Sequence, residues 1–140
     1  MHAFKVLFVD DEIDFLDTLM KRMKKRGVDV RGVGSGEEAL KFLAENPPDV
    51  VVLDVKMPGM DGIQTLKEIK RRHPRVEVIM LTGHASVDAA ITGMELGAFD
   101  YLMKPMDIDE LHFKIQDAYK NKHLHELKMA ERRKYDEVGQ

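Results

Sequence analysis

Five polar side chains that could bind a metal ion and a phosphoryl group are spread along the sequence. Each stands at or just after the end of a short apolar run, and they are Asp10, Asp11, Asp54, Thr82 and Lys104. Neighbouring carboxylates repel one another and raise each other's pKa unless a cation neutralises them. A set of oxygen ligands that retains some water suits Mg²⁺, for which Mn²⁺ could substitute.

The same side chains also meet the needs of phosphoryl transfer. A metal ion beside them would polarise a phosphoryl oxygen and lower the charge barrier to attack by the Asp54 carboxylate. The Lys104 ammonium supplies a point charge for a second phosphoryl oxygen, and the Thr82 hydroxyl can donate a hydrogen bond to a third. Taken alone, Asp10 and Asp11 are equally well explained as acids favoured at a helix N-terminus.

These side chains need a scaffold that brings them together, and the chain alternates between two kinds of segment. Short runs rich in Val, Leu, Ile and aromatic residues predict strands over 5–9, 28–33, 50–53, 76–81 and 99–103. Apolar residues at helical spacing predict helices over about 13–26, 35–43, 62–72, 86–96 and from 107 to about 137. Ser35 and Glu38 form a capping-box pattern at the start of the second helix.

Five strand-then-helix units in series predict an α/β fold. We expect a doubly wound, five-stranded parallel sheet of flavodoxin-like order 2-1-3-4-5 with an extended C-terminal helix. Ligands of such sheets bind beyond the carboxyl ends of the strands. The first, third, fourth and fifth strands would therefore deliver the five polar side chains to one rim.

Composition bounds the class of protein. At 140 residues, with 44% hydrophobic and 34% charged residues, the chain fits one folded domain. A net charge of −3 argues against direct nucleic-acid binding. No apolar run is long enough for a membrane span, and acids at positions 10 and 11 interrupt any signal peptide. There is no cysteine, and we expect a cytoplasmic protein.

Four motifs give the sequence a more specific resemblance. They are VDDE at 9–12, LDVKMPGMDG at 53–62, LTGHAS at 81–86 and DYLMKP at 100–105. All four occur in order, each at a predicted strand end. With these motifs, residues from about 4 to 120 resemble the receiver domains of two-component response regulators. The sequence from 83 to 105 is most similar to that of receivers attached to AAA+ transcriptional activators.

The resemblance implies a role for each acidic residue. Asp54 would be the phosphoacceptor, taking its phosphoryl group from a histidine kinase. Asp11 would bind Mg²⁺ directly and Asp10 through water. The third protein ligand would be the main-chain carbonyl of Lys56. Asp61 is better explained as the N-cap of the third helix than as part of this pocket.

The resemblance also implies a switch and a pocket rim. Thr82 and Tyr101 would form the switch pair; sheet packing is the less favoured explanation of Tyr101. The Lys104–Pro105 peptide bond would be cis and would hold the amine in the pocket. As a hypothesis, Lys56 and His84 overhang the pocket mouth and limit how an attacking water lines up on the acyl phosphate.

By this resemblance the protein is a signalling phosphoacceptor rather than an enzyme, and it catalyses only its own phosphorylation and dephosphorylation. Its partners would be a sensor histidine kinase or phosphotransfer protein and a downstream protein target. An alternative is a receiver fragment of a larger AAA+ activator whose output domains lie beyond residue 140. A phosphatase of the haloacid dehalogenase type is disfavoured, because Lys56 stands where its second acid would be.

The C-terminal helix is longer than a receiver needs. We expect a receiver domain over 1–120 and a helical extension over 121–140, which carries five basic and four acidic residues and so is not a DNA-binding arm. The extension has a heptad-like seam with charge in its middle, made of Leu124, Leu127, Glu131, Lys134 and Val138. Two interpretations stay open: a dimerising coiled coil, and an exposed helix held by pairs such as Lys122–Glu126, Arg132–Asp136 and Arg133–Glu137.

Overall fold

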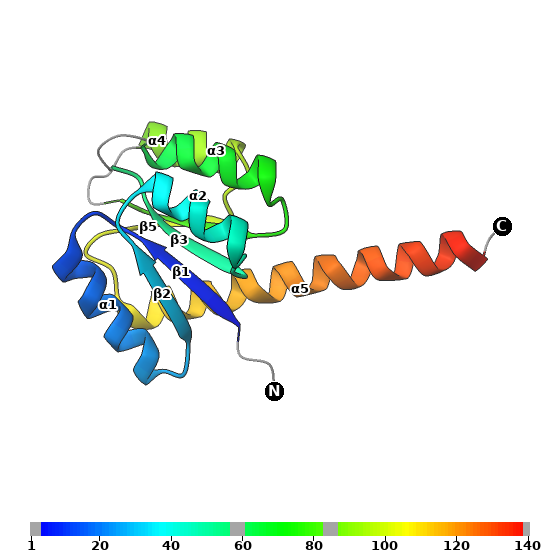
Figure 1. Cartoon of the computed structure of the whole chain (residues 1–140), viewed down its shortest axis with the longest axis horizontal. Helices are drawn as coiled ribbons and strands as arrows, with labels where there is room; N and C mark the ends of the chain where they lie inside the picture. Colours follow the sequence, from blue (N-terminus) through cyan, green and yellow to red (C-terminus); the bar gives the residue numbers. More distant parts are fainter. Residues whose placement is uncertain (1–3, 57–60, 83–86, 139–140) are drawn as a thin grey trace.

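The computed structural model describes residues 4–56, 61–82 and 87–138 of the chain. Strands and helices alternate along it (Figure 1). The strands are β1 (Lys5–Val9), β2 (Asp29–Val33), β3 (Val50–Asp54), β4 (Glu77–Thr82) and β5 (Asp100–Met103). The helices are α1 (Ile13–Lys25), α2 (Gly36–Glu45), α3 (Gly62–Arg72), α4 (Val87–Glu95) and α5 (Ile108–Val138).

The strands form one parallel sheet in the order β2-β1-β3-β4-β5. This confirms the predicted doubly wound α/β fold. Helices α1 and α5 cover one face of the sheet, and α2, α3 and α4 cover the other (Figure 1). Every residue of β3 is buried, because this central strand has helices on both faces.

The sequence places the strand ends within one residue of those in the structure, and the helix ends within about two. The last turn of α1 is basic and is followed by Gly27 at a φ of 81°, a backbone angle that favours glycine. At α2, the Ser35 side chain caps the Glu38 N–H, but the Glu38 carboxylate accepts from the Gly34 N–H instead of completing the capping box at Ser35. The predicted cap of α4, Ser86, lies outside the described residues.

Asp61 caps α3 with a complete capping box. Its carboxylate accepts from the Gln64 N–H at 2.8 Å, and the Gln64 side chain accepts from the Asp61 N–H at 3.2 Å. The adjoining Gly62 lies against the β3 backbone, because a Cβ there would stand 2.5 Å from the Asp54 carbonyl oxygen. This close approach fixes the start of α3 directly behind the end of β3.

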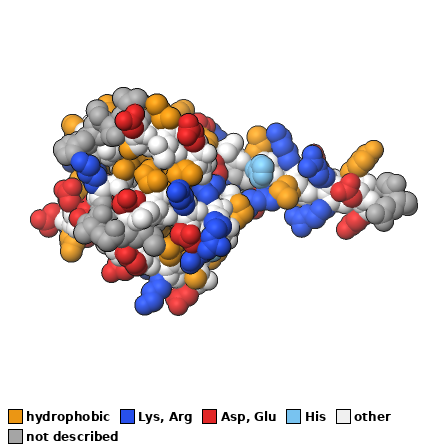
Figure 2. Space-filling view, turned by 90° about the horizontal axis from the view of Figure 1, so that it is seen from above, with side chains coloured by type: hydrophobic (Ala, Val, Ile, Leu, Met, Phe, Trp, Pro, Cys, Tyr) orange, Lys and Arg blue, Asp and Glu red, His pale blue; other side chains and the backbone are white. Residues whose placement is uncertain are grey.

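Helix α5 has 31 residues and is therefore about 46 Å long. Its first turns pack on the sheet through Leu111, Ile115 and Ala118, and the helix then projects away from the domain (Figure 1). Figure 2 shows the projecting part as a rod that carries side chains of both charges. Among the described residues, no helix is apolar enough over a sufficient length to cross a bilayer.

Candidate functional site

The acidic cluster lies at the carboxyl ends of two neighbouring strands. Val9 of β1 pairs with Leu53 of β3, so that the residues after this pair, Asp10 and Asp54, leave the sheet side by side. One oxygen from each of Asp10, Asp11 and Asp54 lies within 4.8 Å of the others. Asp10 and Asp54 are 3% and 4% exposed, whereas Asp11 is open to solvent. The structure thus brings together the three predicted carboxylates.

Main-chain donors hold two of these carboxylates in place. Asp10 Oδ1 accepts from the Glu12 N–H at 2.9 Å, and Asp54 Oδ1 accepts from the Lys56 N–H at 3.3 Å. Each bond spans two residues, which is the local turn that aspartate favours after a strand. Main-chain donors thus engage one oxygen of Asp10 and one oxygen of Asp54.

Lys104 reaches the cluster from the end of β5, the edge strand of the sheet. Its N–H donates to the Thr82 carbonyl oxygen at 2.7 Å, and its peptide bond to Pro105 is cis. The ammonium, on a side chain 13% exposed, donates to Asp10 Oδ2 at 2.8 Å and lies 3.8 Å from Glu12 Oε1. Among the described residues, Lys104 is therefore the only basic residue that forms an ion pair with Asp10.

Phe15 is a member of this site that the sequence analysis missed. The Lys104 Nζ lies 4.2 Å from the centroid of its ring, a cation–π contact. The sequence offers no local signal for this contact, because Phe15 belongs to α1 and Lys104 follows β5, 89 positions later in the chain. The apolar ring and the two carboxylates together fix the direction of the lysine side chain.

The electrostatics of the site follow from burial and from like charges. Burial raises the pKa of Asp54 from 3.8 to about 6, with Asp10 and Asp11 adding to the rise and Lys104 and the Lys56 N–H opposing it. Burial alone would lower the pKa of Lys104. The hydrogen bond to Asp10 and the nearby carboxylates outweigh this effect and raise that pKa. The site therefore holds a charged lysine beside an aspartate that is readily protonated.

The two predicted switch residues lie on neighbouring strands. Thr82 is the last residue of β4 and is 6% exposed, while Tyr101 of β5 is 41% exposed. Because Leu81 pairs with Asp54, Thr82 leaves β4 at the same rim as the acidic cluster. The Tyr101 ring lines an outer groove of β5 together with Met103. The Tyr101 ring is therefore partly exposed to solvent at the edge of the sheet.

The predicted pocket rim is described only in part. The Lys56 side chain is exposed, directly after the turn that holds Asp54. His84 lies outside the described residues.

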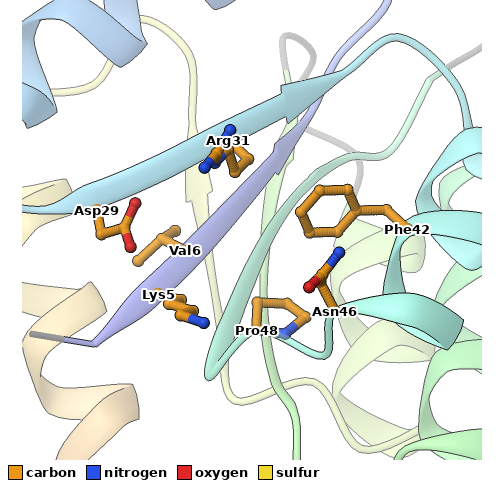
Figure 3. A pocket seen from close by; sticks show the side chains of 7 residues that line it. All are labelled: Lys5, Val6, Asp29, Arg31, Phe42, Asn46 and Pro48. Atoms are coloured by element: carbon orange, nitrogen blue, oxygen red, sulfur yellow. The ribbon is translucent and has the colours of Figure 1, made fainter.

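A second groove is separate from this site. Figure 3 shows it between β1, β2 and α2; it is lined by Lys5, Val6, Asp29, Arg31, Phe42, Asn46 and Pro48. Lys5 and Asp29 begin their strands, so the groove lies at the amino-terminal end of the sheet, opposite Asp10 and Asp54. Its charges are mixed, and it takes no part in the chemistry of the acidic rim.

Comparison with known proteins extends these observations. Residues 6–116 match the family model of the response regulator receiver domain. The DNA-binding transcriptional regulator NtrC of Escherichia coli is 45% identical over 105 residues, which are 75% of this chain and 22% of that protein. The chain therefore spans less than a quarter of the length of this relative.

Solved structures agree with this match. The receiver domain of the Francisella response regulator 1452 superposes with a TM-score of 0.79 at 34% identity, over 85% of this chain and 98% of that one. NtrX from Brucella abortus superposes with a TM-score of 0.86 at 30% identity, over 92% of this chain and 29% of that one.

Proposed function

The chain belongs to the response regulator receiver domain family, and we propose that it accepts a phosphoryl group on Asp54 as part of a two-component phosphorelay. The observation that carries this proposal is the cluster of three carboxylate oxygens within 4.8 Å of one another, closed on one side by the Lys104 ammonium. A sensor histidine kinase or a phosphotransfer protein would be the donor.

The acidic cluster fits a divalent cation. Its carboxylates raise the pKa of Asp54 by mutual repulsion on top of the effect of burial, and a cation would relieve this repulsion. Asp10, Asp11, Asp54 and the main-chain carbonyl of Lys56 would hold Mg²⁺, with Mn²⁺ as a substitute. When bound, the ion supplies charge neutralisation and polarises a phosphoryl oxygen.

In the proposed reaction, an Asp54 carboxylate oxygen forms a bond to phosphorus as the phosphorus–nitrogen bond of the phosphohistidine breaks. The electron pair of that bond stays on the imidazole nitrogen. Lys104 then turns from Asp10 toward a phosphoryl oxygen, and the Thr82 hydroxyl donates to another. The Lys56 N–H keeps the Asp54 carboxylate oriented throughout.

The switch would follow from the new phosphoryl contacts. As Thr82 moves toward the phosphoryl group, the Tyr101 ring turns inward behind it, which biases a two-state equilibrium of α4, β5 and α5. A downstream protein target would bind this surface. Lys56 and His84 at the pocket mouth would set the lifetime of the acyl phosphate.

A second candidate is the receiver portion of a larger transcriptional activator. It is favoured by the match to NtrC, of which the chain covers only 22%. The mass of the native gene product discriminates between the two, because a mass near that of 140 residues would exclude attached output domains. The boundary between a receiver over 1–120 and an extension over 121–140 is part of both proposals.

The test of the central proposal is incubation with acetyl phosphate and Mg²⁺, read by intact mass. We expect a gain of one phosphoryl group in the wild-type protein and none in Asp54→Ala. No gain in the wild-type protein, or a gain that survives Asp54→Ala, contradicts the proposal.

A further inference from the structure

The Lys104 side chain is held at both of its ends. At its base, the Lys104 N–H donates to the Thr82 carbonyl oxygen at 2.7 Å, which ties the residue to the end of β4. At its tip, the ammonium donates to Asp10 Oδ2 at 2.8 Å. The side chain is 13% exposed, so water reaches only a small part of it. The ammonium therefore depends on protein groups for most of its surroundings.

Three contacts of the ammonium come from one short segment of the chain. Asp10, Glu12 and Phe15 span the turn from β1 into the first turn of α1. The Asp10 carboxylate accepts from the Glu12 N–H at 2.9 Å, and the Glu12 carbonyl oxygen accepts from the Leu16 N–H at 2.9 Å. These bonds fix the start of α1 to the acidic rim, and they fix the backbone of Phe15 with it.

The Phe15 ring attracts the ammonium from a fixed position. The ring is half-buried and packs against the apolar core that α1 and α5 form on one face of the sheet. The Lys104 Nζ lies over the ring, 4.2 Å from its centroid. The face of an aromatic ring attracts a cation electrostatically, and most strongly where water is excluded.

Glu12 offers the ammonium a competing position. Its Oε1 lies 3.8 Å from the Lys104 Nζ, and its side chain is 68% exposed. An ammonium that turned toward this carboxylate would move toward solvent and away from Asp10. The Asp10 carboxylate opposes such a turn, and the Phe15 ring adds to that preference.

We propose that Phe15 is a positioning residue for the phosphorylation of Asp54, a role that rests on the proposed function. Its ring holds the Lys104 ammonium at the acidic rim, where the ammonium meets an oxygen of the incoming phosphoryl group. A ring suits this task better than a further carboxylate, because it attracts the cation and adds no negative charge that would repel the phosphoryl donor. The ring acts through Lys104 rather than on the reacting atoms.

The contact between ring and lysine can be measured without any reaction. In the metal-free protein, the ring current of Phe15 should shift the methylene protons next to the Lys104 ammonium upfield of those of exposed lysines in a ¹H–¹³C NMR spectrum. Lys104→Met identifies the signal by its loss. Phe15→Leu keeps an apolar side chain without a ring and should abolish the shift, whereas Phe15→Tyr should retain it. An unchanged shift in Phe15→Leu would overturn the contact.

The rate of phosphorylation supplies the second readout. With acetyl phosphate and Mg²⁺, intact mass followed over time should show Phe15→Leu gaining its phosphoryl group roughly threefold to tenfold more slowly than the wild type. Phe15→Tyr restores an aromatic face and should recover the rate to within about twofold of the wild type. In a Lys104→Met background, Phe15→Leu should cause no further loss, because the ring acts through the lysine.

Phe99→Leu is the matched control for lost packing. Phe99 is half-buried against the same apolar core, but it precedes β5 and so lies at the opposite end of that strand from Lys104. Its substitution should leave the phosphorylation rate unchanged. A wild-type rate in Phe15→Leu, an equal loss in both leucine variants, or a further loss in the Lys104→Met background would each overturn the positioning role.

Failure of the proposed function has a different signature. A wild-type protein that gains no phosphoryl group would contradict that function and the role of Phe15 in the reaction together. The upfield shift of the Lys104 signal would be unaffected in that case, because it reports only the contact with the ring. A normal wild-type rate that Phe15→Leu shares would overturn the role of Phe15 alone.

Discussion

Replacing Asp54 by Asn should make the metal-free protein more stable near neutral pH. The carboxylate is 4% exposed and stands beside two other acids, so its ionised form is disfavoured in the folded state. An asparagine of nearly the same shape keeps an oxygen for the Lys56 N–H, which donates to Asp54 at 3.3 Å. The substitution therefore removes the charge without opening a cavity.

The raised pKa of Asp54 sets the size of this effect. A rise from 3.8 to about 6 corresponds to about 3 kcal/mol, at roughly 1.4 kcal/mol per pH unit. This net rise already includes the attraction of Lys104, which lowers the pKa of Asp54. We expect the free energy of unfolding to increase by about 1–3 kcal/mol, or the melting temperature by about 3–10 °C.

The gain should depend on pH with a definite sign. Because the folded-state pKa lies above the unfolded-state value of 3.8, the folded protein holds its proton more tightly. The stabilisation from this proton is complete below 3.8 and is lost as pH rises through about 6. Wild type and Asp54→Asn should therefore be similar near pH 4 and should differ fully above about pH 7.

Urea unfolding in chelator, followed by circular dichroism over this pH range, measures the difference. Asp11→Asn is the matched control: Asp11 belongs to the same cluster but is exposed, so its substitution should change metal-free stability by less than about 0.5 kcal/mol. Added Mg²⁺ should stabilise wild type and should do so much less for either variant. Equal stability of wild type and Asp54→Asn near neutral pH, or a difference that persists near pH 4, would refute the reasoning.

Three further variants probe other parts of the chain. Lys104→Met leaves buried Asp10 without its ammonium partner at 2.8 Å, and urea unfolding of the metal-free protein should show a loss of about 1–3 kcal/mol. Lys122→Met removes the ion pair to Asp49, so amide hydrogen exchange should quicken over 119–130 while phosphorylation by acetyl phosphate is unchanged. The double variant of Lys56 and His84, both changed to Ala, should lose its phosphoryl group at an altered rate, measured by intact mass over time; an unchanged rate excludes their role at the pocket mouth.

The sequence predicts most of this fold because its signals are local. Gly27 after a basic helix end, the Ser35 cap and the all-apolar run 50–53 each mark one boundary, and neighbouring residues alone decide them. The Glu38 contact to Gly34 shows the limit of such signals. The choice between two adjacent main-chain N–H groups depends on loop geometry that the capping pattern does not contain.

The sequence predicts which residues gather at the strand ends to form the candidate site. It does not predict which of their side chains come into contact. Asp10 and Asp54 are 44 positions apart in sequence and meet only because β1 and β3 are neighbours, which the strand order supplies. The contact of Phe15 with Lys104 depends on where the start of α1 lies relative to the segment that follows β5, and a helical pattern alone does not fix that distance.

The position of β5 explains how a change at the acidic rim could reach the outside of the domain. It is the edge strand next to β4, and it carries Tyr101 on its outer side while Lys104 follows its end. Helix α5 begins four residues after Lys104. In the proposed reaction, a phosphoryl group that draws the Lys104 ammonium away from Asp10 would act directly on β5. This strand lies at the edge of the described sheet and leads into the start of α5. No route through the buried core is needed, because the lysine, the edge strand and the start of α5 are consecutive in the chain.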